Sequence, residues 1–229
     1  MSNACLFSGG KDSTLALHRA MGLGIKIDLL ITMESKNQHS FMFHYPNTGI
    51  TALQAESMGI RQAFFSTEGR KEEELLDLEK AFTSNNVRVL VTGATYSRYQ
   101  SERINSIASR LGIESVAPLW HIDPYEELNT LSRDYEAIIT SVSAEGMDES
   151  LLGRRIDDGL IKKLAELNRH YGINMLFEGG EAESFVLDAP LFSRRILVRS
   201  ARKAWEGTYG TYIIEDAVLA GKKPEAAES

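Results

Sequence analysis

Apolar and polar positions follow two alternating patterns in the first half of the chain. Short apolar runs, which predict buried strands, cover residues 4–7, 26–33, 62–65 and 87–92. Amphipathic stretches, which predict helices, cover residues 14–21, 47–58, 71–84 and 97–111. Because strands that alternate with helices form βαβ units, this half predicts an α/β fold with a parallel sheet and flanking helices.

The second half of the chain has a different order of elements. Helical patterns cover residues 124–133 and 160–171, and strand patterns cover residues 136–142, 194–204 and 209–214. The last two strands flank Trp205, Glu206 and Gly207 as the arms of an antiparallel hairpin would. We therefore expect a first domain over residues 1–120, a smaller C-terminal α+β subdomain over residues 121–221, and a polar, unstructured tail over residues 222–229.

The composition narrows the classes of function. Of the 229 residues, 43 % are hydrophobic and 25 % are charged, as in ordinary globular proteins. No run approaches the roughly 20 apolar residues of a membrane helix, and the first residues do not read as a secretory signal. We therefore expect a cytoplasmic protein without membrane association. The net charge of −7 disfavours direct binding to nucleic acid, and Cys5, as the only cysteine, excludes an internal disulfide and a Cys-rich zinc site.

The strongest local signal is the hexapeptide SGGKDS at residues 8–13, which follows a predicted strand and opens a predicted helix. Free backbone N–H groups and the helix dipole make such a corner favourable for an anion. Adjacent glycines let the backbone turn tightly and approach a phosphate closely. The residues expected to hold the phosphates of a nucleotide are Ser8, Gly9, Gly10, Lys11 and Ser13.

Asp12 sets this loop apart from a Walker A motif, in which the glycines are separated and the lysine precedes Ser or Thr. A carboxylate repels phosphate, so its presence is understandable if a cation lies between the two. The sequence therefore predicts Asp12 as a ligand of Mg²⁺. The alternative is an ordinary glycine-rich turn before a helix, without a nucleotide.

Further segments combine glycine with polar or charged residues where strands are expected to pass into helices. They cover residues 93–104, 117–120, 144–157 and 177–192. Ligands of open α/β sheets bind at the carboxyl ends of the strands. These segments are therefore candidates for a ligand site at that edge of the sheet.

Together with SGGKDS, which matches the PP-loop signature SGGxDS, these segments resemble the diphthine–ammonia ligase family of the N-type ATP pyrophosphatases. The resemblance covers nearly the whole chain and implies a Rossmann-like ATP-binding domain. It also implies a reaction in which ATP, with Mg²⁺, adenylates the carboxylate of diphthine, a modified histidine of elongation factor 2. Ammonia then forms the amide, and AMP and pyrophosphate are released. By the same resemblance, adenine is expected near Met33, and Gly93 is expected beside the nucleotide.

The family motifs are matched unevenly. The pattern G-A-x-x-S-x-Y-Q-x-x-R fits residues 93–103, and D-E-S-x-L-G-R fits residues 148–154. The motif E-G-G-E-[YF]-E-T fits residues 178–184 except at Ala182, where an aromatic residue is usual, and at Ser184, where threonine is usual. The residues expected to contact the substrate are Ser97, Tyr99, Gln100, Arg103, Glu149 and Arg154.

Glu178, Glu181 and Glu183 place three carboxylates in a short glycine-flanked segment. With Lys11 and Asp12 they are the expected catalytic residues, because a positioned carboxylate can orient ammonium or accept its proton. Acidic and aromatic walls also suit the quaternary ammonium group of diphthine. The alternative is a solvated acidic loop.

Other functions remain open at the level of sequence. One is a PP-loop enzyme that acts on tRNA, although the single cysteine and the acidic charge disfavour it. Others are activation of a different carboxylate, or nucleotide binding without turnover. The expected partners are elongation factor 2 and free ammonium, and the sequence leaves a homodimer open.

Overall fold

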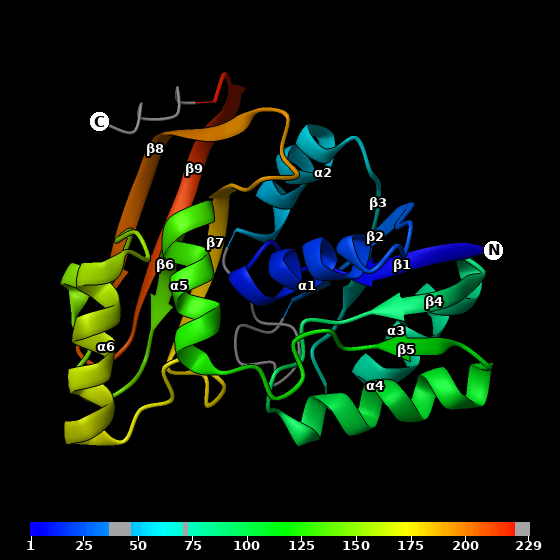
Figure 1. The fold of residues 1–229 in the computed structure, drawn as a ribbon, viewed down its shortest axis with the longest axis horizontal. Coiled ribbons are helices and arrows are strands. Elements are labelled where there is room, and N and C mark those ends of the chain that lie inside the picture. The colour runs from blue at the N-terminus through cyan, green and yellow to red at the C-terminus, as the bar shows by residue number, and fades with distance from the viewer. Residues whose placement is uncertain (37–46, 71–72, 223–229) are drawn as a thin grey trace.

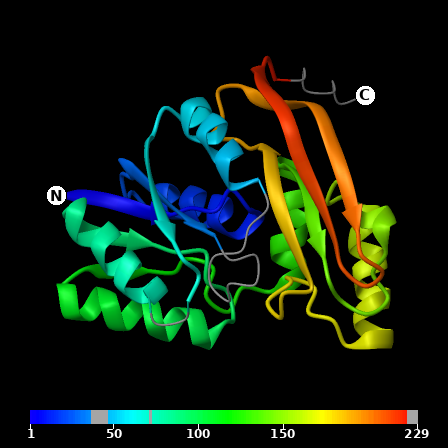
Figure 2. The same cartoon turned by 180° about the vertical axis from the view of Figure 1, so that it is seen from behind.

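The computed structural model describes residues 1–36, 47–70 and 73–222. It contains two sheets that lie side by side with helices around them (Figures 1 and 2). The part of the predicted tail at residues 223–229 lies outside the described residues, as do the first two residues of the helix predicted over residues 71–84.

The first sheet is parallel and has the strand order β3-β2-β1-β4-β5. Its strands are β1 (Ser2–Leu6), β2 (Leu29–Ser35), β3 (Arg61–Thr67), β4 (Val87–Val91) and β5 (Glu114–Val116). The order reverses direction at β1, which pairs with β2 on one side and β4 on the other. This topology confirms the predicted Rossmann-like α/β fold and places a ligand site at the carboxyl ends of β1 and β4.

Helices cover both faces of the parallel sheet (Figure 1). They are α1 (Lys11–Gly22), α2 (Thr51–Met58), which follows the short 3₁₀ turn η1 (Thr48–Ile50), α3 (Glu73–Ser84) and α4 (Arg98–Leu111). Successive side chains of a strand point to opposite faces, so Cys5 packs with α1 while Ala4 packs with α3 and α4. Burial on both faces explains why these strands appear as continuous apolar runs in the sequence.

The second sheet is antiparallel, with the strand order β7-β6-β9-β8. Its strands are β6 (Glu136–Val142), β7 (Ala182–Asp188), β8 (Arg195–Trp205) and β9 (Gly210–Ala220). The helices beside it are α5 (Pro124–Asp134), α6 (Asp158–Tyr171) and the 3₁₀ turn η2 (Glu149–Leu151). The predicted C-terminal α+β architecture and the hairpin around residues 205–207 are confirmed, with a second arm that is longer than predicted.

Two segments differ from the sequence-based expectation. Residues 177–192 do not connect a strand to a helix, because their second part forms β7 of the antiparallel sheet. Polar Glu183 and Ser184 interrupt the apolar pattern of this strand, since both side chains line a cavity. Strand β5 was also missed, because three residues are too few to show a periodic pattern.

One apolar core joins the two sheets. Leu15 and Leu17 of α1 belong to the same buried cluster as Leu128 of α5 and Val186 of β7. The predicted division at residue 120 stays a prediction, because this core is continuous across it.

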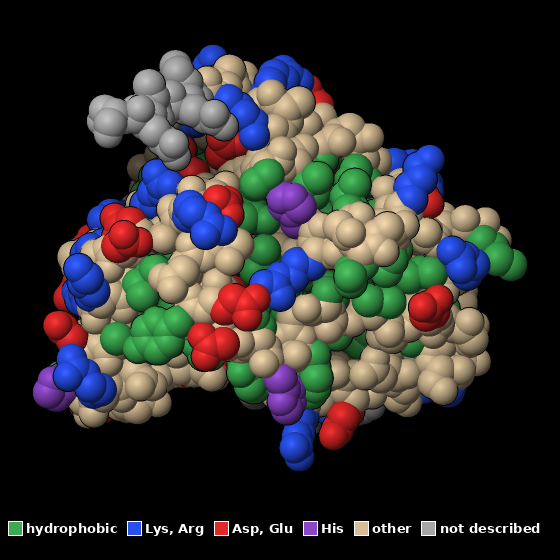
Figure 3. Space-filling model, in the orientation of Figure 1, with side chains coloured by type: hydrophobic (Ala, Val, Ile, Leu, Met, Phe, Trp, Pro, Cys, Tyr) green, Lys and Arg blue, Asp and Glu red, His purple; other side chains and the backbone are tan. Residues whose placement is uncertain are grey.

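The surface in Figure 3 carries acidic and basic side chains that are interspersed over the face shown. A field of one sign, which would steer a polyanion, does not dominate this face. None of the helices in the described ranges combines the length and the apolar character needed to cross a bilayer.

Candidate active site

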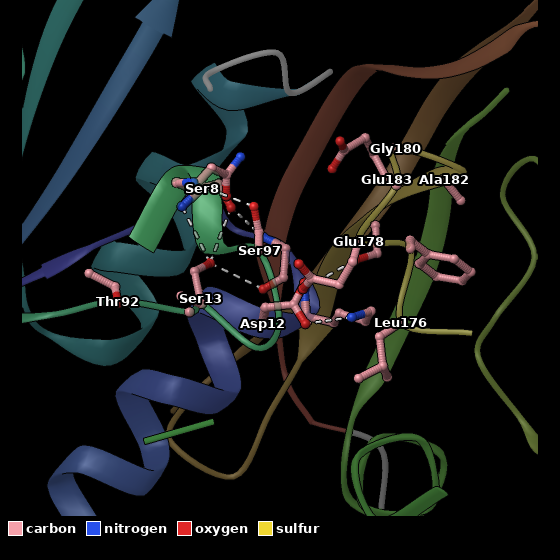
Figure 4. A pocket seen from close by; sticks show the side chains of 18 of the residues that line it. Ser8, Asp12, Ser13, Thr92, Ser97, Leu176, Glu178, Gly180, Ala182 and Glu183 are labelled. Carbon is pink, nitrogen blue, oxygen red and sulfur yellow. Dashed lines mark hydrogen bonds and ion pairs between the residues drawn. The ribbon is translucent and has the colours of Figure 1, made fainter. Parts of the chain in front are cut away.

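A cavity of about 710 Å³ opens at the carboxyl ends of β1 and β4 and extends to β7 of the antiparallel sheet. It is lined by residues of the loop at 8–13, of the segment 92–100 and of the segment 176–184 (Figure 4). Its volume is within the range typical of small-molecule sites. The two sequence motifs that are most distant from each other along the chain therefore share one cavity.

The loop at residues 8–13 turns from β1 into α1 and is held from several sides. Gly9 has a φ of 79°, and a Cβ there would lie 2.4 Å from Gln54 Oε1 and 2.9 Å from the ring of Phe185. The carbonyl of Gly9 accepts hydrogen bonds from Gln54 Nε2 at 3.0 Å and from the Val186 N–H at 2.9 Å. Only glycine suits this position, and β7 thus fixes the loop from the antiparallel sheet.

Hydroxyl groups surround the start of α1. The N–H of Lys11 donates to Ser184 Oγ at 3.1 Å, and the oxygens of Ser8 and Ser13 lie 3.3 Å apart. Ser8 and Ser13 point toward the same part of the cavity, next to Asp12 (Figure 4). A helix N-terminus with hydroxyl donors beside it is a favourable site for phosphate oxygens.

Gly93, at the end of β4, lies directly against the first turn of α1. A Cβ at this position would be 2.8 Å from the carbonyl carbon of Asp12 and from the nitrogen of Ser13. The glycine therefore allows β4 to approach the phosphate loop, in addition to lining the cavity as predicted.

Replacing Gly93 with alanine is expected to displace the first turn of α1, because the neighbouring backbone atoms cannot move independently. We expect a loss of about 1–3 kcal/mol in the free energy of unfolding and about tenfold weaker binding of Mg·ATP. Chemical denaturation and calorimetry measure the two effects. The control is Gly22→Ala at the end of α1, where a Cβ meets nothing within 4 Å; equal effects of both substitutions would contradict the proposed packing role.

Lys11 is buried and carries two ion pairs. Its ammonium contacts the carboxylate of Asp12 and lies 2.9 Å from Glu127 Oε1 of α5. Burial lowers the pKa of Lys11, but the two carboxylates outweigh this effect and raise it above its ordinary value. Burial raises the pKa of Glu127, and the ammonium of Lys11 opposes this shift. The two carboxylates therefore favour the charged form of Lys11 at the start of α1.

Two further carboxyl groups line the cavity. Glu178 accepts a hydrogen bond from Thr95 Oγ1, and its side chain lies opposite Asp12 (Figure 4). Burial raises the pKa of Glu178, although this hydrogen bond acts in the other direction. Burial, with the negative charges of Asp12 and Glu178, raises the pKa of Glu183 to about 8, and the ammonium of Lys11 opposes the shift. Both carboxyl groups are therefore stronger proton acceptors than an ordinary glutamate.

Glu181 has a different position from the other two glutamates of its motif. Its carboxylate oxygens accept hydrogen bonds from the N–H groups of Asn174 and Gly179, both at 2.8 Å. It is not among the residues that line the cavity. The contacts indicate that Glu181 shapes the loop that carries Glu178.

The predicted substrate residues divide into two groups. Ser97, which caps α4, lines the cavity together with Tyr99 and Gln100, and the guanidinium of Arg103 lies 3.8 Å from the ring centre of Tyr99. Met33 lines it from the end of β2. The other group, Glu149 and Arg154, lies outside the cavity.

Glu149 and Arg154 lie outside the cavity because residues 148–154 form a turn beside the antiparallel sheet. The Glu149 carbonyl accepts a hydrogen bond from Lys203 Nζ at 3.4 Å, and Arg154 Nη2 lies 3.9 Å from Asp157 Oδ1. The predicted contact of these two residues with the substrate stays a prediction, because they do not line the cavity.

Comparisons with known proteins place the chain in a family. Residues 1–115 match the family model for the diphthamide synthase N-terminal domain, and residues 123–220 match that for the diphthamide synthase C-terminal domain. The chain belongs to the diphthamide synthase family. It is 31 % identical over 225 residues to the human diphthine–ammonia ligase, covering 88 % of this chain and 84 % of that protein. It is also 30 % identical to the diphthine–ammonia ligase of Schizosaccharomyces pombe, covering 84 % of this chain and 35 % of that protein.

A similarity to a solved structure was also found. The crystal structure of a predicted subunit of tRNA methyltransferase from Methanocaldococcus jannaschii shares 15 % identity and a TM-score of 0.42, covering 83 % of this chain and 98 % of that one.

The human and Schizosaccharomyces pombe relatives are ligases, so this member of the diphthamide synthase family is an enzyme.

Sequence reasoning missed Glu127, Gln54, Thr95 and Ser184. Glu127 and Gln54 look like ordinary polar positions of amphipathic helices, and their partners lie 116 and 45 residues away. Ser184 was noted only as a departure from the family motif, although its hydroxyl contacts the phosphate loop. A buried charge at a core position of α5 is visible only in the structure.

Proposed function

We propose that this member of the diphthamide synthase family is an ATP-dependent amide ligase that adenylates the carboxylate of diphthine on elongation factor 2 and amidates it with ammonia. AMP and pyrophosphate are the other products. The observation that carries the proposal is the shared cavity, in which the phosphate loop at residues 8–13 faces the acidic segment at residues 178–183. The end of the cavity at residues 8–13 suits an anion. The end at residues 178–183 suits a cation or a proton transfer.

The phosphate end supports the binding of ATP. The first turn of α1 presents backbone N–H groups and the hydroxyls of Ser8 and Ser13, and Gly9 lets the loop turn closely against Gln54 and Phe185. Met33 lies at the end of β2, where the family resemblance places adenine. The α-phosphate would then lie between the loop and Glu178.

The residues present fit Mg²⁺ when the nucleotide supplies further ligands. Within the described ranges no group of three or more His, Cys, Asp or Glu side chains could hold a metal ion by itself. Mg²⁺ is commonly held by one or two carboxylates together with substrate phosphates. Asp12, whose side chain is 32 % exposed and faces the cavity, is the residue that would hold it. The ion would neutralise charge on the phosphates beside three cavity carboxylates.

The acidic end supports the use of ammonia. Glu178 and Glu183 are partly enclosed carboxyl groups with raised pKa values, which makes them better proton acceptors than ordinary glutamates. Tyr209 and Phe177 add aromatic rings to the same wall, which suits a quaternary ammonium group. Both cationic parts of the reaction, ammonium and the trimethylammonium group, match this end.

The proposed reaction has two steps. In the first, an oxygen of the diphthine carboxylate attacks the α-phosphorus of ATP, and the bond to the β-phosphate oxygen breaks to release pyrophosphate at the loop. In the second, ammonium gives a proton to Glu178 or Glu183, and the resulting ammonia attacks the acyl carbon. The bond from the acyl carbon to the phosphate oxygen breaks, so that AMP leaves, and the nitrogen releases its second proton to solvent to give the amide. The chain's own residues position the reactants and accept a proton, and such positioning supplies most of the rate in reactions of this type.

Mass spectrometry of elongation factor 2 tests the proposal. Diphthine-bearing elongation factor 2 is incubated with the protein, Mg·ATP and ammonium, and the peptide with the modified histidine is analysed. We expect the carboxamide only when all components are present, with one AMP formed for each amide. An unchanged peptide, with full turnover of another carboxylate or of tRNA in the same assay, would contradict the choice of substrate.

A further inference from the structure

Glu127 is a fully buried carboxylate that no sequence motif of the reaction includes. It lies on α5, between the two sheets, where its neighbours Leu128 and Leu131 are also fully buried. Its side chain is 0 % exposed, and its Oε1 accepts a hydrogen bond from Lys11 Nζ at 2.9 Å. A buried ion pair contributes little net stability compared with apolar side chains of similar volume. A role in the site explains the pair better than stability does.

Lys11 is shared by two carboxylates that differ in their access to the cavity. Glu127 is enclosed, whereas the side chain of Asp12 is 32 % exposed and lines the cavity. The ring centre of Phe177 lies 5.5 Å from the Lys11 ammonium. The second oxygen of Glu127, Oε2, is buried and has no hydrogen-bond partner in the described part of the chain. Glu127 therefore has unused capacity to accept a hydrogen bond from the ammonium.

This arrangement matters when Asp12 binds a metal ion. A buried ammonium that loses its counter-ion is strongly destabilised, so Lys11 can release Asp12 only if another carboxylate remains. We propose that Glu127 is a positioning residue, which keeps Lys11 paired so that Asp12 is free to bind the Mg²⁺ of the nucleotide. This inference rests on the proposed function, because it concerns the same phosphate loop.

Without the charge of Glu127, Asp12 is the remaining carboxylate in contact with Lys11, and the ammonium retains it. Metal binding at Asp12 then competes with a buried ion pair. By contrast, the affinity for nucleotide without metal should be unchanged or higher, because one negative charge near the phosphates is removed. A residue that only supports the fold would not separate these two effects.

The test is the substitution Glu127→Gln, which keeps the size of the side chain. Calorimetry measures the binding of ATP without metal and across a series of Mg²⁺ concentrations. We expect about tenfold more Mg²⁺ for half-maximal nucleotide binding than in the wild type. We expect the affinity for metal-free ATP to be unchanged or higher.

Glu126→Gln is the matched control. Glu126 precedes Glu127 on the same helix and also pairs with α1, through Arg19 at 2.5 Å, but it is 56 % exposed. This variant should keep the Mg²⁺ requirement of the wild type. Glu127→Asp, which retains the charge, should lie between the wild type and Glu127→Gln, and it serves in place of the latter if that protein does not fold.

The outcomes separate the inference from the proposed function. An unchanged Mg²⁺ requirement in a folded Glu127 variant, or an equal shift in Glu126→Gln, would overturn the positioning role and leave the proposed function intact. A wild-type protein that binds no Mg·ATP at all would overturn the proposed function itself.

Discussion

Replacing Asp12 with asparagine is expected to reduce ATP–pyrophosphate exchange, measured with the carboxylate substrate, by about 100–1,000-fold. This is the usual effect of removing one preorganised electrostatic group from an active site. Asp12 is the carboxylate of the phosphate loop that faces the cavity. Asparagine has nearly the same size, and Lys11 keeps its ion pair with Glu127, so the fold should be preserved. Unfolding by denaturant checks that expectation.

The control for this substitution is Asp158→Asn. Asp158 lies in the first turn of α6, so it also places a carboxylate at a helix N-terminus, but it does not line the cavity. The exchange activity of the Asp158→Asn protein should stay within about twofold of the wild type. Surface charges near helix ends contribute only tenths of a kcal/mol to about 1 kcal/mol. A fully active Asp12→Asn protein would show that Asp12 is not needed to bind the metal ion.

Replacing Glu183 with glutamine is expected to slow amidation by about 100-fold or more, as the loss of a general base usually does. Because the pKa of Glu183 is raised to about 8, mainly by burial, the wild-type rate should rise with pH up to about 8. The rate of the glutamine variant should lack this dependence. The measurement is the rate of amide formation across the pH range at saturating ATP and constant free ammonia. A retained rise with pH would assign the proton transfer to another group.

The same substitution should make the protein more stable at alkaline pH. A folded-state pKa of about 8, against the ordinary glutamate value of 4.5, means that the folded protein holds a proton that the unfolded chain has lost. Stability of the wild type therefore falls between pH 4.5 and about 8, and it does not change further above that range on account of this group. The full loss of stability is on the order of 5 kcal/mol. Glutamine cannot ionise, so the Glu183→Gln protein does not lose this stability as the pH rises.

Urea unfolding at pH 5 and at pH 8.5 measures this effect. The two proteins are compared by how much the difference in their free energies of unfolding grows with pH. We expect the Glu183→Gln protein to gain stability relative to the wild type by a few kcal/mol between the two pH values. Glu145→Gln, at a glutamate exposed to solvent, should show no such gain. Equal behaviour of the two variants would mean that burial does not disfavour the ionised form of Glu183.

Local signals in the sequence predicted the order of the first eight elements and the position of the loop at residues 8–13 between β1 and α1. Residues 8–13 form a site from consecutive positions, so their chemistry is visible in a hexapeptide. The parallel sheet follows from apolar runs buried on both faces. Gly93 was predicted from the family resemblance, but its close approach to the Asp12 backbone depends on how β4 packs against α1.

The rest of the site depends on contacts between distant segments. Glu127 contacts Lys11 across 116 residues, and its apolar neighbours on α5 give no sign of a buried charge. Strand β7 was not predicted, because Glu183 and Ser184 face the cavity and interrupt its apolar pattern, so that residues 177–192 were expected where a strand passes into a helix. Glu149 and Arg154 match a family motif, and the structure places the turn that carries them beside the antiparallel sheet, outside the cavity.

The central claim is that the start of α1 holds the pyrophosphate of ATP while the acidic segment of β7 faces the reacting phosphate. A crystal structure with Mg²⁺ and a non-hydrolysable ATP analogue tests it most directly. We predict the β- and γ-phosphates at the N–H groups of residues 9–13, the metal ion on Asp12, and adenine beside Met33. A triphosphate bound elsewhere, with the loop at residues 8–13 free of phosphate, would contradict the account.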